Sequence, residues 1–132
     1  MSRRSHETSR PTEAELEILH VLWTRGPSTV RDVHDALYRE QGSGYTNALK
    51  LLQVMHAKGL VVRDDAQRAH VYRAALSKGR AQRRFLNDLV ARVFEGSRAE
   101  LVLQALGGQR ASREEITAIR ALLDRLDEES QP

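Results

Sequence analysis

The stretch GYTNALKLLQVMHAKGLVVR, residues 44–63, decides the fold because the spacing of its apolar residues changes at Gly59. Before this glycine they recur at the three- and four-residue spacing of a helix, and the glycine ends that helix. After it, Leu60–Arg63 reads as a strand, residues 64–68 as a polar turn and Ala69–Arg73 as a returning strand. The stretch and its continuation therefore predict a helix followed by a β-hairpin.

Two helices are predicted upstream, and each begins at a threonine that can cap it. Thr12 opens a capping box in front of a leucine-rich run, and Gly26–Pro27 ends that helix. Thr29 caps a second helix that we expect to reach about Glu40, followed by a turn over residues 41–44. Three short helices followed by one hairpin is the element order of a winged helix-turn-helix.

The rest of the chain reads as further helices with long apolar stripes. Ser97 can cap a short helix that ends at Gly107–Gly108, and Ser112 begins a capping box before the last helix. So short a segment cannot bury these stripes alone, and we expect a second copy of the chain to cover them. Packing against the winged helix of the same chain is the alternative. The candidate dimerisation residues are Phe85, Leu89, Val93, Leu101, Ile116, Ile119, Leu122, Leu123 and Leu126.

The predicted fold class is mainly α with a small β-hairpin. A hydrophobic content of 40% allows a packed core, and an aromatic content of only 5% favours aliphatic side chains on helices. We expect three parts along the chain. These are a disordered arm over residues 1–11, a winged helix-turn-helix domain over 12–75 and a helical dimerisation region over 76–128.

Positive charge is concentrated in one part of the chain, although the formal net charge is only +3. Residues 66–87 contain no acidic side chain. Such a stretch suits a polyanion such as nucleic acid, and a solvated basic surface is the alternative. The basic residues within it are Arg68, Arg73, Lys78, Arg80, Arg83 and Arg84.

Several classes of protein are excluded by what the sequence lacks. The absence of cysteine excludes a disulfide scaffold, a zinc finger and a cysteine-based metal sensor. No nucleophile elbow, zinc-protease motif or phosphate-binding glycine loop occurs, and the histidines lack metal-ligand spacing. We therefore expect no enzyme, no cofactor and no metal. The polar N-terminus and the lack of an apolar run approaching ~18 residues predict a cytoplasmic protein without membrane insertion.

The helix over residues 45–58 carries a polar face without any acidic side chain. On such a face Lys can donate to guanine or phosphate, and Asn and Gln can pair with adenine edges. The hairpin adds Gln67 and Arg68 at its tip and Arg63 and Arg73 on its strands, which can contact phosphates or the minor groove. An ordinary solvated face, which usually carries Glu beside Lys, is the alternative. The candidate DNA contacts are Thr29, Tyr45, Thr46, Asn47, Lys50, Gln53, Arg63 and Arg68.

Several runs together resemble the penicillinase-repressor family. They are ELEILHVLW (residues 15–23), GPSTVRDV (26–33), GYT (44–46), KGL (58–60) and RAHVY (68–72). The resemblance covers roughly residues 11–126 and is strongest over 11–73. It implies a homodimeric repressor with an N-terminal winged helix on a palindromic double-stranded DNA operator and a helical C-terminal dimerisation region.

The resemblance also implies a route of regulation. In several family members, repression ends when a membrane metallopeptidase pathway leads to cleavage in the C-terminal region. The corresponding bond here joins Gln104 to Ala105 in place of the family's Asn-Phe, which leaves cleavage open. Thr46-Asn47-Ala48 replaces the family's frequent Thr-Thr-Val, so we expect a different operator.

Two other functions stay open at this point. One is a winged-helix module that binds protein and no DNA. The other is a ligand-sensing repressor, for which an apolar cavity near Phe85 and Tyr72 would be the structural indication.

Overall fold

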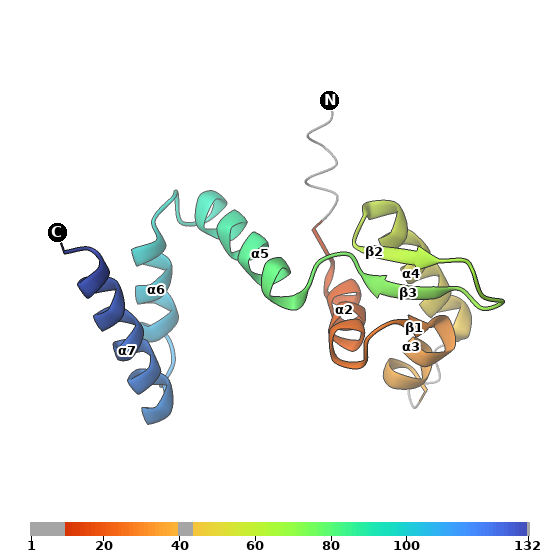
Figure 1. Ribbon diagram of the computed structural model, residues 1–132, viewed down its shortest axis with the longest axis horizontal. Coiled ribbons are helices and arrows are strands. Elements are labelled where there is room, and N and C mark those ends of the chain that lie inside the picture. Colours follow the sequence, from red (N-terminus) through yellow and green to blue (C-terminus); the bar gives the residue numbers. More distant parts are fainter. Residues whose placement is uncertain (1–9, 40–43, 132) are drawn as a thin grey trace. The chain divides into compact units, whose positions relative to one another are not determined.

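The computed structural model describes residues 10–39 and 44–131 (Figure 1). Most of the arm predicted over residues 1–11 and most of the turn predicted over 41–44 lie outside these residues. The chain divides into two compact units, residues 1–85 and 86–132, which are described separately. The elements are α2 (Glu13–Arg25), β1 (Ser28–Thr29), α3 (Val30–Leu37), α4 (Tyr45–Lys58), β2 (Val61–Asp64), β3 (Val71–Ala74), α5 (Lys78–Arg92), α6 (Arg98–Gly107) and α7 (Arg113–Glu129).

The helices of the first unit begin where the predicted caps lie. The Thr12 hydroxyl accepts the Glu15 N–H at 3.2 Å while the Glu15 carboxylate accepts the Thr12 N–H at 2.9 Å. Thr29 and Asp32 form the same reciprocal pair at the start of α3. The predicted bounds of α4 are confirmed, and Gly59 ends it in the left-handed conformation at φ 84°.

The prediction that α3 reaches Glu40 is wrong, because this helix ends at Leu37. Tyr38 leaves helical geometry and places its side chain in the core with 7% of its surface exposed. Burial of this aromatic ring directs the chain out of the helix one turn earlier than the sequence indicated.

The sheet has three strands in the order β1-β3-β2, with both pairings antiparallel (Figure 1). The predicted hairpin is present, and its strands are Val61–Asp64 and Val71–Ala74, shifted by one or two residues from the expected bounds. The expectation of a single hairpin missed β1, which pairs Ser28 with Tyr72. A two-residue strand carries no alternation that sequence could reveal, since it exists through pairing with residues far along the chain.

The core of the first unit lies between α2, α3, α4 and the sheet. Its most deeply buried side chains come from each of these elements, so the helices and the hairpin are packed as one body. They include Ile18, Val33, Leu52, Met55 and Tyr72.

The second unit contains the end of α5 together with α6 and α7. The expected cap at Ser97 and the capping box at Ser112 are present. The last helix, α7, ends at Glu129, where the Ser130 N–H donates to the Leu126 carbonyl and the Ser130 hydroxyl donates to the Asp127 carbonyl. Among residues 86–131, Val90 alone is buried. None of the helices described is long and apolar enough to cross a membrane.

Candidate nucleic-acid interface

The two faces of α4 differ sharply in burial. Ala48, Leu52 and Met55 are fully buried in the core. The opposite face exposes the side chains of Thr46, Asn47, Lys50 and Gln53 to solvent. This helix therefore presents hydrogen-bonding groups and one positive charge on a face that has no carboxylate of its own, while its apolar face fixes its orientation.

A partly buried ion pair holds the C-terminal end of α4 against the start of α2. The Lys58 ammonium nitrogen lies 2.7 Å from Oε1 of Glu15, whose side chain is only 2% exposed. The same carboxylate oxygen also accepts the Thr12 N–H. The sequence indicates only the capping-box role of Glu15, because nothing in a separation of 43 residues signals the pair.

An aromatic cluster lies at the start of α4. The Arg31 guanidinium carbon is 5.9 Å from the centroid of the Tyr45 ring, and the His34 ring centroid is 6.4 Å from the same ring. A cation over an aromatic face is held by the ring quadrupole, so Arg31 is oriented beside Tyr45. Arg31 is exposed and was not among the predicted contacts, although its place early in a capped helix was visible in the sequence.

The predicted contacts of the hairpin are not equivalent. Arg68, in the loop between β2 and β3, is exposed, and so is Arg73 on β3. Arg63 is different, since its side chain is 29% exposed and its Nε lies 2.8 Å from Oδ1 of Asp65. That pairing offsets part of the Arg63 charge, so Arg68 and Arg73 present the less compensated charges of the hairpin.

Thr29 is committed to the structure of α3. Its hydroxyl accepts the Asp32 N–H at 3.1 Å, and its own N–H donates to Oδ2 of Asp32 at 3.0 Å. The second of these bonds lowers the pKa of Asp32, since it stabilises the ionised carboxylate. A contact from Thr29 to another molecule would have to share this hydroxyl.

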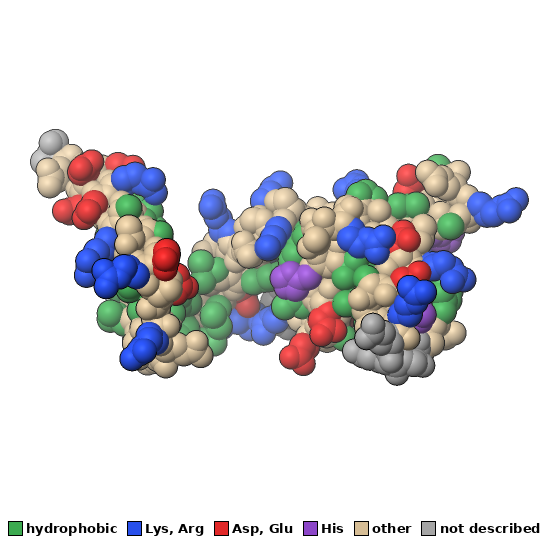
Figure 2. Space-filling view, turned by 90° about the horizontal axis from the view of Figure 1, so that it is seen from below, with side chains coloured by type: hydrophobic (Ala, Val, Ile, Leu, Met, Phe, Trp, Pro, Cys, Tyr) green, Lys and Arg blue, Asp and Glu red, His purple; other side chains and the backbone are tan. Residues whose placement is uncertain are grey.

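Basic side chains also gather at the beginning of α5. Lys78, Arg80, Arg83 and Arg84 are all exposed within the first two turns. Positive charge at a helix N-terminus interacts unfavourably with the helix dipole, so these side chains do not stabilise α5. Figure 2 shows Lys and Arg side chains on the surface of each unit.

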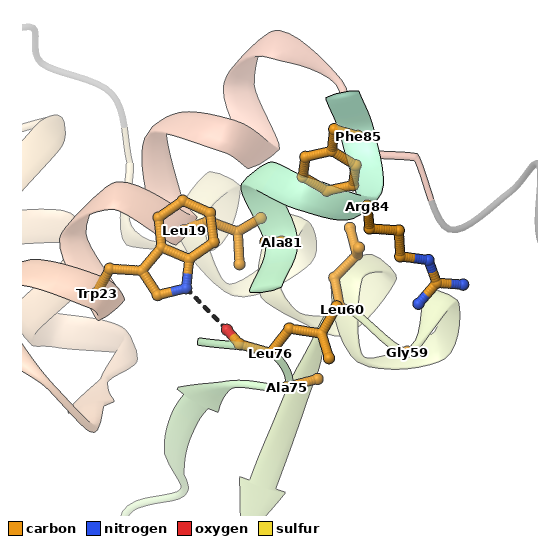
Figure 3. Close-up of a pocket in the computed structure, with 9 residues that line it drawn as sticks. All are labelled: Leu19, Trp23, Gly59, Leu60, Ala75, Leu76, Ala81, Arg84 and Phe85. Carbon is orange, nitrogen blue, oxygen red and sulfur yellow. Dashed lines mark hydrogen bonds between the residues drawn. The ribbon is translucent and has the colours of Figure 1, made fainter. Parts of the chain in front are cut away.

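The candidate dimerisation residues are largely on the surface of the second unit. Val93 is 62% exposed and Leu123 57%, while Leu101, Ile116 and Ile119 are partly buried. The predicted set omitted Leu103 of α6, which at 71% is the most exposed of the large apolar side chains described. Phe85 belongs instead to the first unit, where it lines a pocket with Trp23 (Figure 3).

The remaining sequence predictions concern cleavage and metal binding. Gln104 and Ala105 lie inside α6, and both side chains are exposed. In the parts of the chain that the structure describes, no three His, Asp or Glu side chains are grouped so that they could hold a metal ion.

Comparison with known proteins identifies the relatives of the chain. A family model described as penicillinase repressor matches residues 11–125. The chain is 29% identical over 121 residues to a protein named transcriptional regulator BlaI from Mycobacterium tuberculosis (strain CDC 1551 / Oshkosh), a match that spans 90% of this chain and 86% of that protein. The protein of the same name from strain ATCC 25618 / H37Rv matches with the same identity and coverage.

Proposed function

The chain belongs to the penicillinase repressor family, and on this premise we propose that it represses transcription as a homodimer bound to a palindromic DNA operator. The family is one of transcriptional repressors and not of enzymes. The observation that carries the proposal is the outward face of α4, which is exposed, polar and free of carboxylates.

We assign α4 to the major groove, whose width of about 12 Å admits a helix. Lys50 would donate to guanine or to phosphate, and Asn47 and Gln53 would pair with adenine edges. Their exposure supports this assignment, as does the rigid seating of the opposite face in the core. Tyr45 and Thr46, which are exposed at the start of the same helix, complete the contact surface.

The hairpin would contact the DNA backbone beside α4. Arg68 and Arg73 are the exposed cations of this hairpin and are suited to phosphate or minor-groove contact. Arg63 is already paired with Asp65, so we expect a smaller contribution from it. Such backbone contacts position the protein and raise affinity for any duplex without reading its sequence.

A second copy of the chain would cover the apolar side chains of the second unit. The proposal is supported by the near absence of buried residues among 86–131, since a segment with so little core gains little stability by folding alone. A two-fold dimer would also present two α4 helices about 34–36 Å apart, or a multiple of this distance, to the two halves of a palindrome.

Loss of the dimer is the proposed route to release of repression. Cleavage between Gln104 and Ala105, in response to a membrane metallopeptidase pathway, would separate α7 from the rest of the chain. Leu122, Leu123 and Leu126 would leave with it. Because the bond lies inside α6, a protease would first have to unwind this helix locally.

Selection of duplexes from a random pool by the purified protein tests the proposal. We expect a consensus with two-fold symmetry whose half-site centres are about 10 base pairs, or a multiple of that, apart. Affinity should fall by about a thousandfold between roughly 50 and 200 mM salt, because neutralised phosphates release counterions. A protein-interaction module would instead select no duplex, and flat salt dependence or an asymmetric consensus would contradict the proposal.

Substitutions separate base contacts from backbone contacts. Lys50→Ala should reduce the preference for the consensus over other duplexes by about tenfold or more, and Arg68→Ala should weaken binding to all duplexes alike. Arg120→Ala in α7 removes one exposed positive charge from the second unit and serves as the matched control. Equal effects of Lys50→Ala and Arg120→Ala would contradict the assignment of α4.

A further inference from the structure

The first unit contains an apolar pocket that the proposed function does not use. Its volume is about 120 Å³, and all the residues that line it belong to residues 1–85. Trp23 and Leu19 of α2, Leu60 before β2, and Ala81 and Phe85 of α5 surround it, with Arg84 at its edge (Figure 3). Tyr72, in contrast, is fully buried and is not among the lining residues.

We propose that this pocket binds a short branched-chain carboxylate, with its hydrocarbon end among the apolar side chains and its carboxylate at Arg84. The volume of the pocket limits the size of the ligand's hydrocarbon end. A cavity of about 150 Å³ holds benzene, and this pocket is somewhat smaller. A branched group of about four or five carbons matches that volume.

The polar groups around the pocket select against sugars and other ligands with many hydroxyl groups. The Trp23 indole N–H already donates to the Leu76 carbonyl at 2.9 Å, as the dashed line in Figure 3 shows. The Leu60 N–H donates to the Met55 carbonyl, and the Leu60 carbonyl accepts the Ala75 N–H. Hydroxyl groups buried against these paired atoms would lose their bonds to water without replacement.

Arg84 is the group that indicates an anionic ligand. Within residues 10–39 and 44–131, no ion pair or hydrogen bond engages its guanidinium. Its side chain extends along the pocket on the side of Gly59, and the guanidinium points away from Trp23 (Figure 3). A ligand whose apolar end lies beside Trp23 would therefore bring its carboxylate toward this cation, which can bind both oxygens.

The site is separate from the candidate DNA contacts. None of those contacts lines the pocket, so a failure of DNA binding would leave this inference untouched. The pocket lies between α2 and the first turns of α5, and α5 continues past Phe85 into the second unit. Ligand binding would hold these first turns against α2, which gives a small molecule a place to act on the helix that connects the two units.

Titration with isovalerate, followed by the fluorescence of Trp23, tests the inference in the full-length protein. Trp23 is the sole tryptophan of the chain and lines the pocket, so its emission reports on occupancy directly. We expect saturable binding with a Kd of about 1 mM, as suits a ligand of about seven heavy atoms. The neutral analogue 3-methylbutan-1-ol should bind about fivefold more weakly, since it lacks the charge.

Two variants locate the carboxylate. Arg84→Gln should weaken isovalerate about fivefold and leave the alcohol unchanged. Arg83→Gln, which removes the neighbouring exposed cation outside the pocket, should change neither. Ala75→Val should weaken both probes by filling the pocket, and circular dichroism would check that it folds.

Three outcomes would overturn the inference. One is no saturable change of Trp23 emission up to about 10 mM of either probe. Another is equal affinity for the acid and the alcohol in the natural chain. The third is equal weakening by Arg84→Gln and Arg83→Gln, which would show a diffuse effect of net charge.

Discussion

Removing the Lys58 ammonium should destabilise the first unit far more than removing an exposed cation. In Lys58→Met, the Glu15 carboxylate would stay in a site that is 2% exposed with one remaining hydrogen bond, from the Thr12 N–H. Breaking a buried pair by removing one partner costs about 3–5 kcal/mol. Because the Lys58 side chain is itself 22% exposed, water can reach part of the vacated space, and we expect about 2–3 kcal/mol.

This loss converts to a large change in thermal stability. For a domain of this size, one kcal/mol corresponds to roughly 4–8 °C, so the unfolding midpoint reported by Trp23 fluorescence should fall by about 10–20 °C. Arg25→Met is the matched control, because the Arg25 guanidinium lies 4.0 Å from Asp32 with about half of its side chain exposed. We expect that control to cost less than about 0.5 kcal/mol.

A double-mutant cycle isolates the pair itself. Glu15→Gln keeps an oxygen for the Thr12 N–H but removes the charge that Lys58 neutralises. In the variant that combines Glu15→Gln with Lys58→Met, no unpaired charge is left, so its loss of stability should be smaller than the sum of the single losses by about 1–2 kcal/mol. Additive losses, or a Lys58→Met variant as stable as the Arg25→Met control, would refute the account of a buried pair.

Three further substitutions test the caps and the second unit. Asp32 has a lowered pKa, so its contribution to stability is complete above the unfolded pKa of about 3.9 and is lost as pH falls through the folded value. Asp32→Asn should therefore lower the free energy of unfolding in urea near neutral pH and have little effect at about pH 2; an equal loss at both would contradict the shift. Gly59→Ala meets no neighbouring atom within 4 Å but must adopt φ 84°, so it should cost about 1 kcal/mol in the same assay, and a neutral result would contradict the left-handed cap. Leu123→Asp with Leu126→Asp should give a monomer in analytical ultracentrifugation, and a dimer retained by this variant would place the interface elsewhere.

Local features of the fold could be read from the sequence because their causes are local. Thr12, Thr29 and Ser112 each begin a helix through hydrogen bonds three residues away, and Gly59 ends α4 through its own backbone conformation. The polar side of α4 followed from helical period alone, and the exposure of Lys50 agrees with it. Features of this kind depend on residues that are close together in the sequence.

What the sequence missed depends on contacts between distant residues. Strand β1 exists because Ser28 pairs with Tyr72, and the Glu15–Lys58 pair joins the ends of two helices. Arg31 lies beside Tyr45 because α3 and α4 pack against each other. No regular spacing in the sequence indicates these pairings, so they could be recognised only in the folded structure.

The two units differ in the source of their stability, and this difference can be measured through the concentration dependence of unfolding. The first unit has its own core, whereas residues 86–131 bury only Val90 and expose several leucines. If a second copy supplies the missing burial, folding of α6 and α7 is coupled to association and must follow mass action. The midpoint of helix loss by circular dichroism should then rise with protein concentration, while the midpoint reported by Trp23 should depend on it less. If the midpoints from circular dichroism and from Trp23 fluorescence coincide and do not change over about a hundredfold range of protein concentration, the second unit is stable without a partner.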